Sequence, residues 1–199
     1  MTRQQQVVIV GGGVIGLLTA FNLASEVQSI VLLDRSNVGQ ESSWAGGGIV
    51  SPLYPWRYSP AVTALAHWSQ DFYPQLGERL FAATGIDPEV HTTGLYWLDL
   101  DDEVEALAWA ERENRPLRAV DISAAHDAVP VLGAGFSRAI HMADVANVRN
   151  PRLVKSLKAA LLEWYFDHAQ NAFADGMGGD GEFLANLKRL LPRQGVKMF

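Results

Sequence analysis

The chain has 199 residues, a formal net charge of -6 and no cysteine. The missing cysteines exclude disulfides, a thiolate nucleophile and cysteine metal or iron–sulfur sites. The 16 Lys and Arg residues are scattered, whereas nucleic-acid binders cluster basic side chains against phosphates, so no nucleic-acid partner is expected.

No signal peptide is recognisable and no apolar run reaches the roughly 18 residues of a membrane span, which predicts a cytoplasmic protein without a membrane partner. The five histidines are far apart in sequence, so no metal site is expected.

The first 35 residues have the pattern of a βαβ unit. Residues 7–10 are a β-branched apolar run, typical of a strand buried on both faces of a parallel sheet. Three glycines follow, then helical apolar spacing over residues 14–25 and a second buried strand over residues 29–33. This order predicts an α/β fold with a Rossmann-like nucleotide-binding unit.

The glycine turn has the spacing of a dinucleotide-binding fingerprint. Gly11 permits a tight turn, Gly13 lets the backbone approach a pyrophosphate, and Gly16 lets the helix pack closely on the sheet. The free N–H groups of the helix N-terminus suit phosphate. Asp34 ends the second strand, where a carboxylate accepts hydrogen bonds from ribose hydroxyls and repels a 2′-phosphate. The alternative is an ordinary glycine turn in an α/β core.

The fingerprint alone does not separate FAD from NAD, but residues 36–59 bear on the choice. We expect a long functional loop there, with few helix signals. The hydroxyls of Ser42 and Ser43 and the glycines at 46–48 can hold phosphates and let a flat flavin ring approach, a feature that a nicotinamide dehydrogenase does not need. A plain surface loop is the alternative.

The rest of the chain predicts further helices and strands. Ser59-Pro60 starts a helix that continues toward residue 84 and that Pro74 should kink or split. The other expectations are strands at 94–100 and 137–142, a short helix opened by Asp101-Asp102, a helix from Asn150, a linker at 175–181 and an amphipathic helix at 182–191.

Several other side chains are candidates for a site. Trp44, Tyr54 and Trp56 flank the glycines and either line a pocket or, more commonly, pack locally. Arg57 and Arg149 are possible carboxylate partners by charge. We interpret the acidic residues at the start of the short helix as a solvated face: Asp101, Asp102, Glu103 and Glu105.

Five stretches of sequence resemble a known family. Val-Gly-Gly-Gly-Val-Ile-Gly at 10–16 with Leu-Leu-Asp-Arg at 32–35 is common to many flavoproteins, and Glu-Ser-Ser-Trp-Ala-Gly-Gly-Gly-Ile-Val-Ser-Pro at 41–52 is more specific. Together with His-Thr-Thr-Gly-Leu-Tyr at 91–96 and Asn-Val-Arg-Asn-Pro-Arg-Leu at 147–153, they are similar to FAD-dependent amine oxidases of the D-amino-acid oxidase superfamily. Within it, the chain most resembles the glycine oxidases of thiamine biosynthesis.

The resemblance implies an activity and a cofactor. The family oxidises the amine of glycine, sarcosine or a small D-amino acid to an imine by hydride transfer to FAD, and O2 is then reduced to H2O2. Family members form homo-oligomers. The resemblance also implies FAD contacts at Val14 and Ile15 beside the pyrophosphate, Asp34 and Arg35 beside the adenosine, Ser42 and Ser43 beside the phosphates, and Gly47, Gly48 and Ile49 near the flavin.

The resemblance covers about residues 5–162, whereas chains of the family are nearly twice as long as this one. It implies an FAD-binding unit and flavin loop at 1–59, a partial substrate domain at 60–146, a return helix at 147–162 and an unmatched tail at 163–199. The family's substrate-binding residues fall outside the matched part, so the catalytic residues here are unknown and we expect little or no activity. The alternatives are a non-catalytic nucleotide-binding remnant and an NAD-dependent dehydrogenase.

Overall fold

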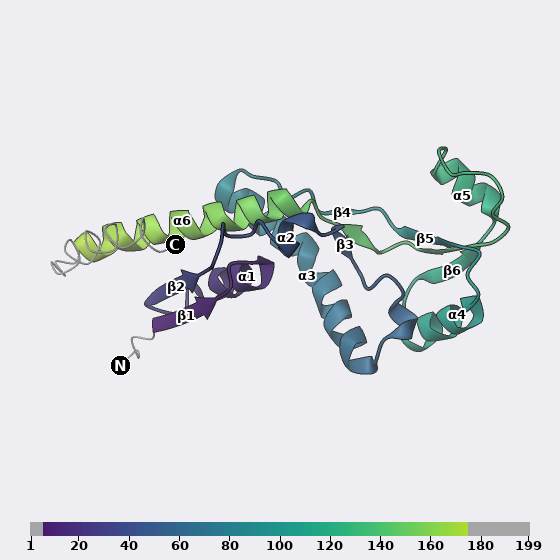
Figure 1. Ribbon diagram of the computed structural model, residues 1–199, viewed down its shortest axis with the longest axis horizontal. Helices are drawn as coiled ribbons and strands as arrows, with labels where there is room; N and C mark the ends of the chain where they lie inside the picture. The colour runs from purple at the N-terminus through teal and green to yellow at the C-terminus, as the bar shows by residue number, and fades with distance from the viewer. Residues whose placement is uncertain (1–5, 175–199) are drawn as a thin grey trace. The chain divides into compact units, whose positions relative to one another are not determined.

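The computed structural model describes residues 6–174, with side chains described for residues 6–165 (Figure 1). The expected linker and the amphipathic helix at 182–191 lie outside this part of the chain. The described residues form two compact units. The first holds residues 6–47, 77–88 and 149–174, and the second holds residues 48–76 and 89–148.

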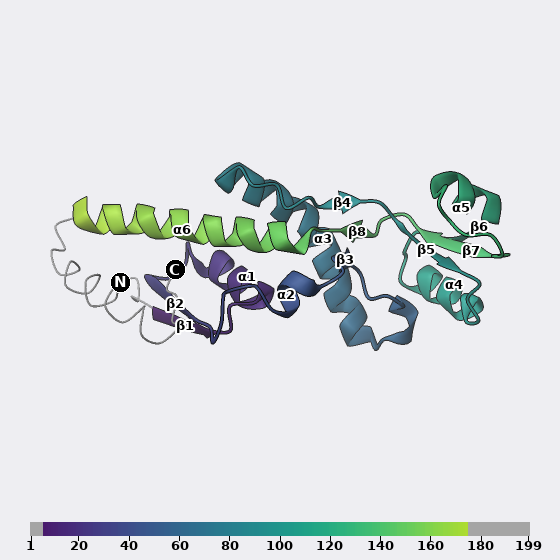
Figure 2. The same cartoon turned by 45° about the horizontal axis from the view of Figure 1, so that its top comes forward.

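The first unit opens with the expected βαβ arrangement. Strand β1 (Gln6–Val10) and strand β2 (Ser29–Leu33) are parallel, with Gln6 opposite Ser29 and Val10 opposite Leu33. Helix α1 (Val14–Leu23) connects them, and the long helix α6 (Asn150–Ala174) lies beside α1 (Figure 2). The apolar side chains between these elements are buried, among them Leu17, Leu32, Val38, Leu153 and Leu157. The predicted α/β class with a Rossmann-like region is confirmed.

One expectation for β1 is wrong. The strand is not buried on both faces, since Val8 is 61% exposed and Val10 is 84% exposed. Within the described residues the sheet has only two strands, and α1 packs on one of its faces. A β-branched apolar run favours an extended backbone in apolar surroundings. Whether one or both faces of the strand are covered is set by tertiary structure.

Residues 36–59 contain more regular structure than expected. They form a four-residue helix α2 (Ser42–Ala45), a two-residue strand β3 (Ile49–Val50) and a 3₁₀ turn η1 (Pro55–Arg57). Helix α2 packs against α6, and a side chain at Gly46 would collide with Asn150, the first residue of α6. A helix this short depends on such packing, because local propensity cannot nucleate it alone.

Helix α3 (Pro60–Thr84) begins at the predicted proline and stays continuous through Pro74. Pro74 was expected to kink or split the helix; the split does not occur, and a kink stays a prediction. The division between the two units nevertheless falls between Leu76 and Gly77, directly after this proline. Pro74 has no backbone N–H and therefore removes one intrahelical hydrogen bond close to this division.

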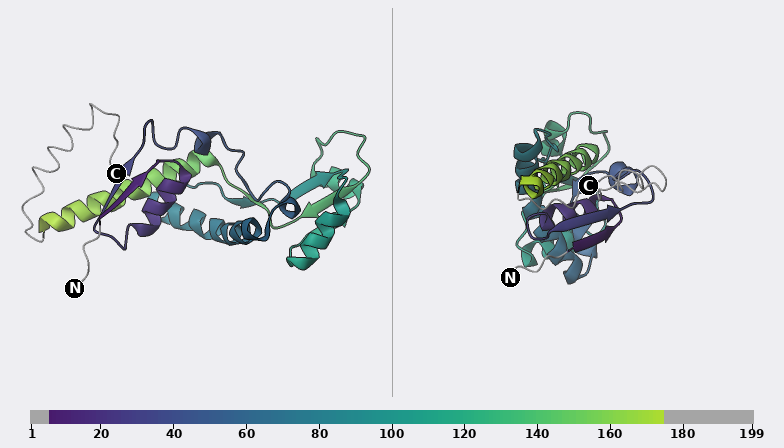
Figure 3. Two further views of the ribbon diagram at one scale, coloured as in Figure 1. Left: turned by 60° about the horizontal axis from the view of Figure 1, so that its bottom comes forward. Right: turned by 90° about the vertical axis from the view of Figure 1, so that its left-hand side faces the viewer.

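The second unit contains two small antiparallel sheets. In one, β7 (Ala139–Met142) lies between β5 (Leu95–Leu98) and β6 (Leu117–Val120); in the other, β8 (Ala146–Asn147) lies between β3 and β4 (His91–Thr92). Helix α4 (Glu103–Arg112) packs beside β6 (Figure 3). Helix α5 (Ile122–Ala128) follows that strand in the chain. The strands at 95–98 and 139–142 were predicted, whereas β4, β6, β8 and α5 carry too little periodic signal.

The core of the second unit is rich in tryptophan. Trp97, Trp109, Ile140 and Met142 form its centre, and Tyr54 and Trp56 pack against it. The Trp97 indole N–H donates to the carbonyl of Leu53 at 2.7 Å. For Tyr54 and Trp56 the local-packing interpretation is therefore confirmed, while Trp44 is 47% exposed in the first unit.

Residues 6–174 contain neither a membrane-spanning helix nor a cluster of metal-binding side chains. None of the helices in that stretch is long and apolar enough to cross a membrane. In the same stretch, no three His, Cys, Asp or Glu side chains are grouped so that they could hold a metal ion.

Candidate functional site

The candidate site begins at the turn between β1 and α1. The Gly11 N–H donates to the carbonyl of Leu33 at 2.7 Å and joins the ends of the two parallel strands. Gly11 has φ of 105°, a conformation that residues with a side chain rarely adopt. A Cβ at Gly16 would overlap the carbonyl oxygen of Gly11, so the helix approaches the turn only because Gly16 has no side chain.

The first turn of α1 offers backbone donors and no competing acid. Gly13 is the N-cap and has no side chain with which to cap the helix, and the first turn contains no Asp or Glu. The Val14 N–H donates instead to Ser43 Oγ of α2 at 2.8 Å, and Ile15 is 75% exposed. The Ser43 hydroxyl accepts this bond and still has its own hydrogen to donate. Together with the positive end of the helix dipole, this arrangement suits an anion such as phosphate.

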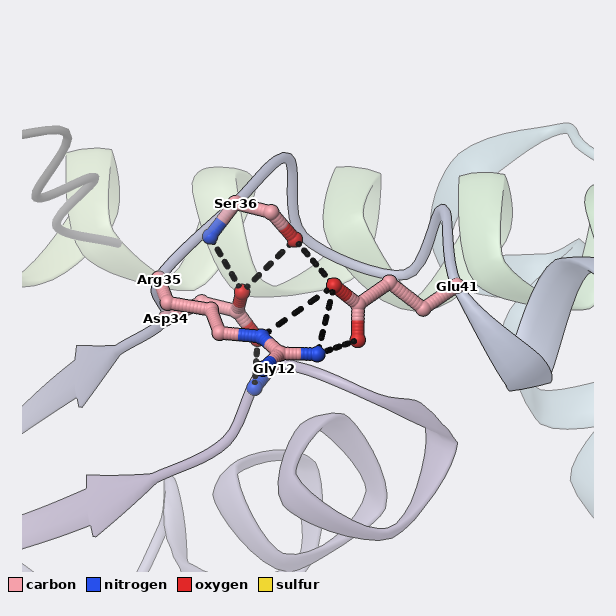
Figure 4. Close-up of polar contacts among 5 residues, drawn as sticks. All are labelled: Gly12, Asp34, Arg35, Ser36 and Glu41. Carbon is pink, nitrogen blue, oxygen red and sulfur yellow. Dashed lines mark hydrogen bonds and ion pairs between the residues drawn. The ribbon is translucent and has the colours of Figure 1, made fainter.

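Asp34 joins the glycine turn to the loop after β2 (Figure 4). Its Oδ2 accepts from the Gly12 N–H at 2.6 Å, and its Oδ1 accepts from the Ser36 N–H at 2.7 Å. These backbone hydrogen bonds, Ser36 first and Gly12 second, hold the pKa of Asp34 below its ordinary value, so the carboxylate stays ionised. A carboxylate has about four acceptor positions, which leaves capacity for ribose hydroxyls.

Arg35, the next residue, is paired with a residue that the sequence did not identify. Arg35 Nη2 lies 3.1 Å from Glu41 Oε2, and its Nε lies 3.3 Å from Glu41 Oε1. The Ser36 hydroxyl lies 3.2 Å from Asp34 Oδ1 and 3.1 Å from Glu41 Oε1 (Figure 4). Hydrogen bonds from Arg35, its charge and the Ser36 hydroxyl lower the pKa of Glu41. Glu41 and Ser36 were missed because they lie in a loop without periodicity, where sequence spacing carries no contact information.

The expected FAD contacts are divided between the two units. Gly11, Gly13, Val14, Ile15, Gly16, Asp34, Arg35, Ser42, Ser43 and Gly47 all belong to the first unit, and Gly48 and Ile49 belong to the second. Ser42 is exposed, and a Cβ at Gly47 would meet open space. The Gly48 carbonyl accepts from the Val148 N–H at 2.8 Å, and Ile49, 46% exposed, pairs with Asn147 in the sheet.

Arg57, a candidate carboxylate partner, is paired within the second unit. Its Nε lies 2.7 Å from Asp102 Oδ2 and its Nη2 lies 2.9 Å from Oδ1, while the Trp56 indole N–H donates to the same Oδ2 at 2.7 Å. The Arg57 guanidinium, followed by the Trp56 indole, lowers the pKa of Asp102 to about 2. The sequence had suggested that Asp102 belongs to a solvated helix start. That interpretation is wrong for Asp102, which is paired with Arg57 and Trp56.

The first unit fits the adenosine diphosphate part of a dinucleotide. The N-terminus of α1 offers donors without an opposing acid, Ser43 adds a hydroxyl, and Asp34 is an ionised acceptor at the end of the neighbouring strand. Phosphate needs the donors and ribose needs the acceptor. A dinucleotide-binding α/β protein is the class that this fold and this site define.

The comparisons with known proteins narrow the class. A family model described as FAD dependent oxidoreductase (DAO) matches residues 6–172, beyond residue 162 where we expected the resemblance to end. The chain belongs to this family of FAD-dependent oxidoreductases.

Individual relatives agree with that assignment. Glycine oxidase of Pseudomonas putida is 84% identical over 158 residues, and that of Pseudomonas aeruginosa is 66% identical over 160 residues. These matches cover 79% and 80% of this chain, and the chain spans 43% and 44% of the relatives' length. Among solved structures, glycine oxidase from Geobacillus kaustophilus has a TM-score of 0.72 and 26% identity, covering 79% of this chain and 44% of that one.

Proposed function

We propose that this chain binds FAD through its first unit and belongs to an oxidase of glycine or a related small amino acid. The observation that carries the proposal is the convergence of the α1 N-terminus, Ser43 and the ionised Asp34 in a chain of the DAO family. The relatives named glycine oxidase support the choice of substrate class.

Each residue of the site has a role in this proposal. The Ile15 N–H and the hydroxyls of Ser42 and Ser43 hold the pyrophosphate, and Val14, whose own N–H donates to Ser43 Oγ, lies beside it. Asp34 accepts hydrogen bonds from the adenosine ribose, and Arg35 lies at the adenine edge. Gly47, Gly48 and Ile49 leave space for the flavin ring, which fits the open space at Gly47.

When bound, FAD would supply the redox chemistry, which is oxidation of the substrate amine to an imine with O2 as electron acceptor and H2O2 as product. The residues of this chain bind and orient the cofactor. The substrates in this proposal are glycine, sarcosine and small D-amino acids, in thiamine biosynthesis and in the cytoplasm. The groups that bind the substrate are not identified in this chain. Homo-oligomerisation is part of the same proposal.

The proposal keeps the four segments expected from the sequence. Residues 1–59 form the FAD-binding unit and flavin loop, residues 60–146 contribute to the substrate domain, residues 147–162 return the chain to the FAD-binding part, and residues 163–199 are the tail.

Visible absorbance and peroxide formation test the proposal. The purified chain is reconstituted with FAD, its visible spectrum is recorded, and H2O2 is assayed with glycine, sarcosine and D-proline. We expect weak FAD retention and no peroxide from the 199-residue polypeptide, because it spans only 43% and 44% of the length of the two Pseudomonas glycine oxidases. Full-length Pseudomonas putida glycine oxidase, the 84% identical relative, is the positive control.

The outcomes separate the candidate functions. Flavin binding without turnover is the expected result, and peroxide formation that depends on glycine would contradict the inactivity while supporting the substrate class. A colourless protein that instead binds NADH and quenches its fluorescence would favour the NAD-dependent dehydrogenase.

A further inference from the structure

The loop after β2 contains a charge arrangement that the proposed FAD site does not require. Arg35 is the residue next to Asp34, and its side chain is 84% exposed. Glu41 holds that guanidinium through two of its nitrogens, at 3.1–3.3 Å from the carboxylate oxygens. Glu41 is itself 53% exposed and is oriented by the Ser36 hydroxyl at 3.1 Å.

The pair lies at the end of the second strand, where a βαβ unit binds the adenosine ribose, and this position indicates its chemical role. A carboxylate at the end of the second strand of a βαβ unit faces the adenosine ribose, and an arginine beside it can accommodate a phosphate on the ribose 2′-oxygen. An arginine binds phosphate through two parallel N–H donors, as Arg35 now binds Glu41. Asp34 repels such a phosphate, but Asp34 by itself leaves the N–H donors of Arg35 available to bind one.

We propose that Glu41 is a specificity-determining residue that occupies the Arg35 guanidinium and so excludes adenine nucleotides carrying a 2′-phosphate. The inference rests on the proposed function, because it needs an adenosine site at Asp34. Its physical basis is competition, since the carboxylate of Glu41 and a ribose 2′-phosphate would use the same N–H donors. With Glu41 in place, a 2′-phosphate meets two carboxylates and an arginine that is already paired.

Two small probes test the inference without the loaded enzyme. The affinities of adenosine 5′-diphosphate and adenosine 2′,5′-bisphosphate for the 199-residue chain are measured by calorimetry at low ionic strength, where exposed charges are least screened. The variant Glu41→Gln keeps the shape of the side chain and removes its charge. We expect this variant to bind the 2′,5′-bisphosphate about tenfold more tightly, the effect of one charge-assisted contact, with affinity for the 5′-diphosphate unchanged.

Two further variants control for simpler explanations. Glu26→Gln makes the same change in net charge at an exposed position of the first unit and should leave both affinities unchanged. The double variant Glu41→Gln, Arg35→Gln should lose the gain for the 2′,5′-bisphosphate, because the donor is then absent.

Every other result counts against the inference. An equal gain in Glu26→Gln would assign the effect to net charge, and a gain that persists in the double variant would assign it to another cation. Loss of the 5′-diphosphate affinity in Glu41→Gln would make Glu41 a structural residue. If the unchanged chain binds no adenosine 5′-diphosphate, the proposed function itself fails, and this result is distinct from the others.

Discussion

At the scale of single residues, two aspartates each accept hydrogen bonds that favour the ionised carboxylate, but they join different segments of the chain. Asp34 accepts two backbone N–H groups and fixes the distance between the glycine turn and the loop after β2. Asp102 accepts Trp56 and Arg57 and fixes the 3₁₀ turn η1 to the start of α4. Each carboxylate has a lowered pKa because hydrogen-bond donors favour its charged form.

Replacing Asp34 tests the ribose contact. We expect Asp34→Ala to weaken binding of adenosine 5′-diphosphate by about 1–3 kcal/mol, since hydrogen bonds to a charged group are lost. Calorimetry with the 199-residue chain measures the change. Asp34→Asn, which keeps the size and one acceptor oxygen, should lose less. An unchanged affinity in Asp34→Ala would exclude Asp34 from the nucleotide site.

Replacing Asp102 tests the pH dependence of the second unit. Its pKa is about 2 in the folded chain against an ordinary value of 3.8, so its stabilising effect is present above pH 4 and disappears as the pH falls toward 2. We expect the difference in urea midpoint between the unchanged chain and Asp102→Asn to shrink over that range, as followed by tryptophan fluorescence. The control is Glu105→Gln, an exposed carboxylate of the same helix. A difference that is constant from pH 5 to pH 2 would contradict the assignment.

At the scale of elements, the glycine turn and the short helix α2 show what a pattern can and cannot predict. The turn was predictable because Gly11 adopts a positive φ and Gly16 leaves no room for a Cβ, two local demands that glycine meets. Helix α2 was not, because it depends on packing against α6, whose first residue, Asn150, is more than a hundred residues away in sequence. The contact between Ser43 and Val14 follows from that packing and was equally invisible.

Two glycine substitutions separate close packing from mere flexibility. We expect Gly16→Ala to destabilise the first unit by about 1–3 kcal/mol, because a Cβ there overlaps the carbonyl oxygen of Gly11. Gly47→Ala, where a Cβ meets open space, should change the free energy of unfolding by less than about 0.5 kcal/mol. Urea denaturation measures both. Equal losses in the two variants would mean that the steric argument for Gly16 is wrong.

At the scale of the whole molecule, the chain passes back and forth between two units that have separate cores. Leu157 is fully buried in the first and Met142 is fully buried in the second. The family resemblance implied a segment boundary at residue 59, which stays a prediction. The compact units of the structure are defined by contacts and not by chain order, so residues 48–59 belong to the second unit and residues 77–88 to the first.

One truncation in each core tests this division. We expect Leu157→Ala and Met142→Ala each to cost about 2–5 kcal/mol, the usual range for a cavity at a fully buried site. Hydrogen exchange locates the effect: faster exchange in β1, β2 and α1 for Leu157→Ala, and in β5, β6 and β7 for Met142→Ala. Leu162→Ala, at a residue that is 37% exposed in the same helix as Leu157, should cost less. Identical exchange patterns for the two core variants would contradict the division into units.

The sequence by itself determined the βαβ unit, the position of the glycine turn, the acidic strand end and the family, because each depends on local sterics or on a contiguous motif. It also predicted the strands at β5 and β7 and the starts of α3 and α6 from periodicity and helix-capping residues. Only the tertiary structure decided that β1 is half-exposed, that Ser43 meets Val14, that Asp102 is paired and that Glu41 holds Arg35. These contacts join segments without a shared period, so their existence follows from how the chain packs and not from any local preference.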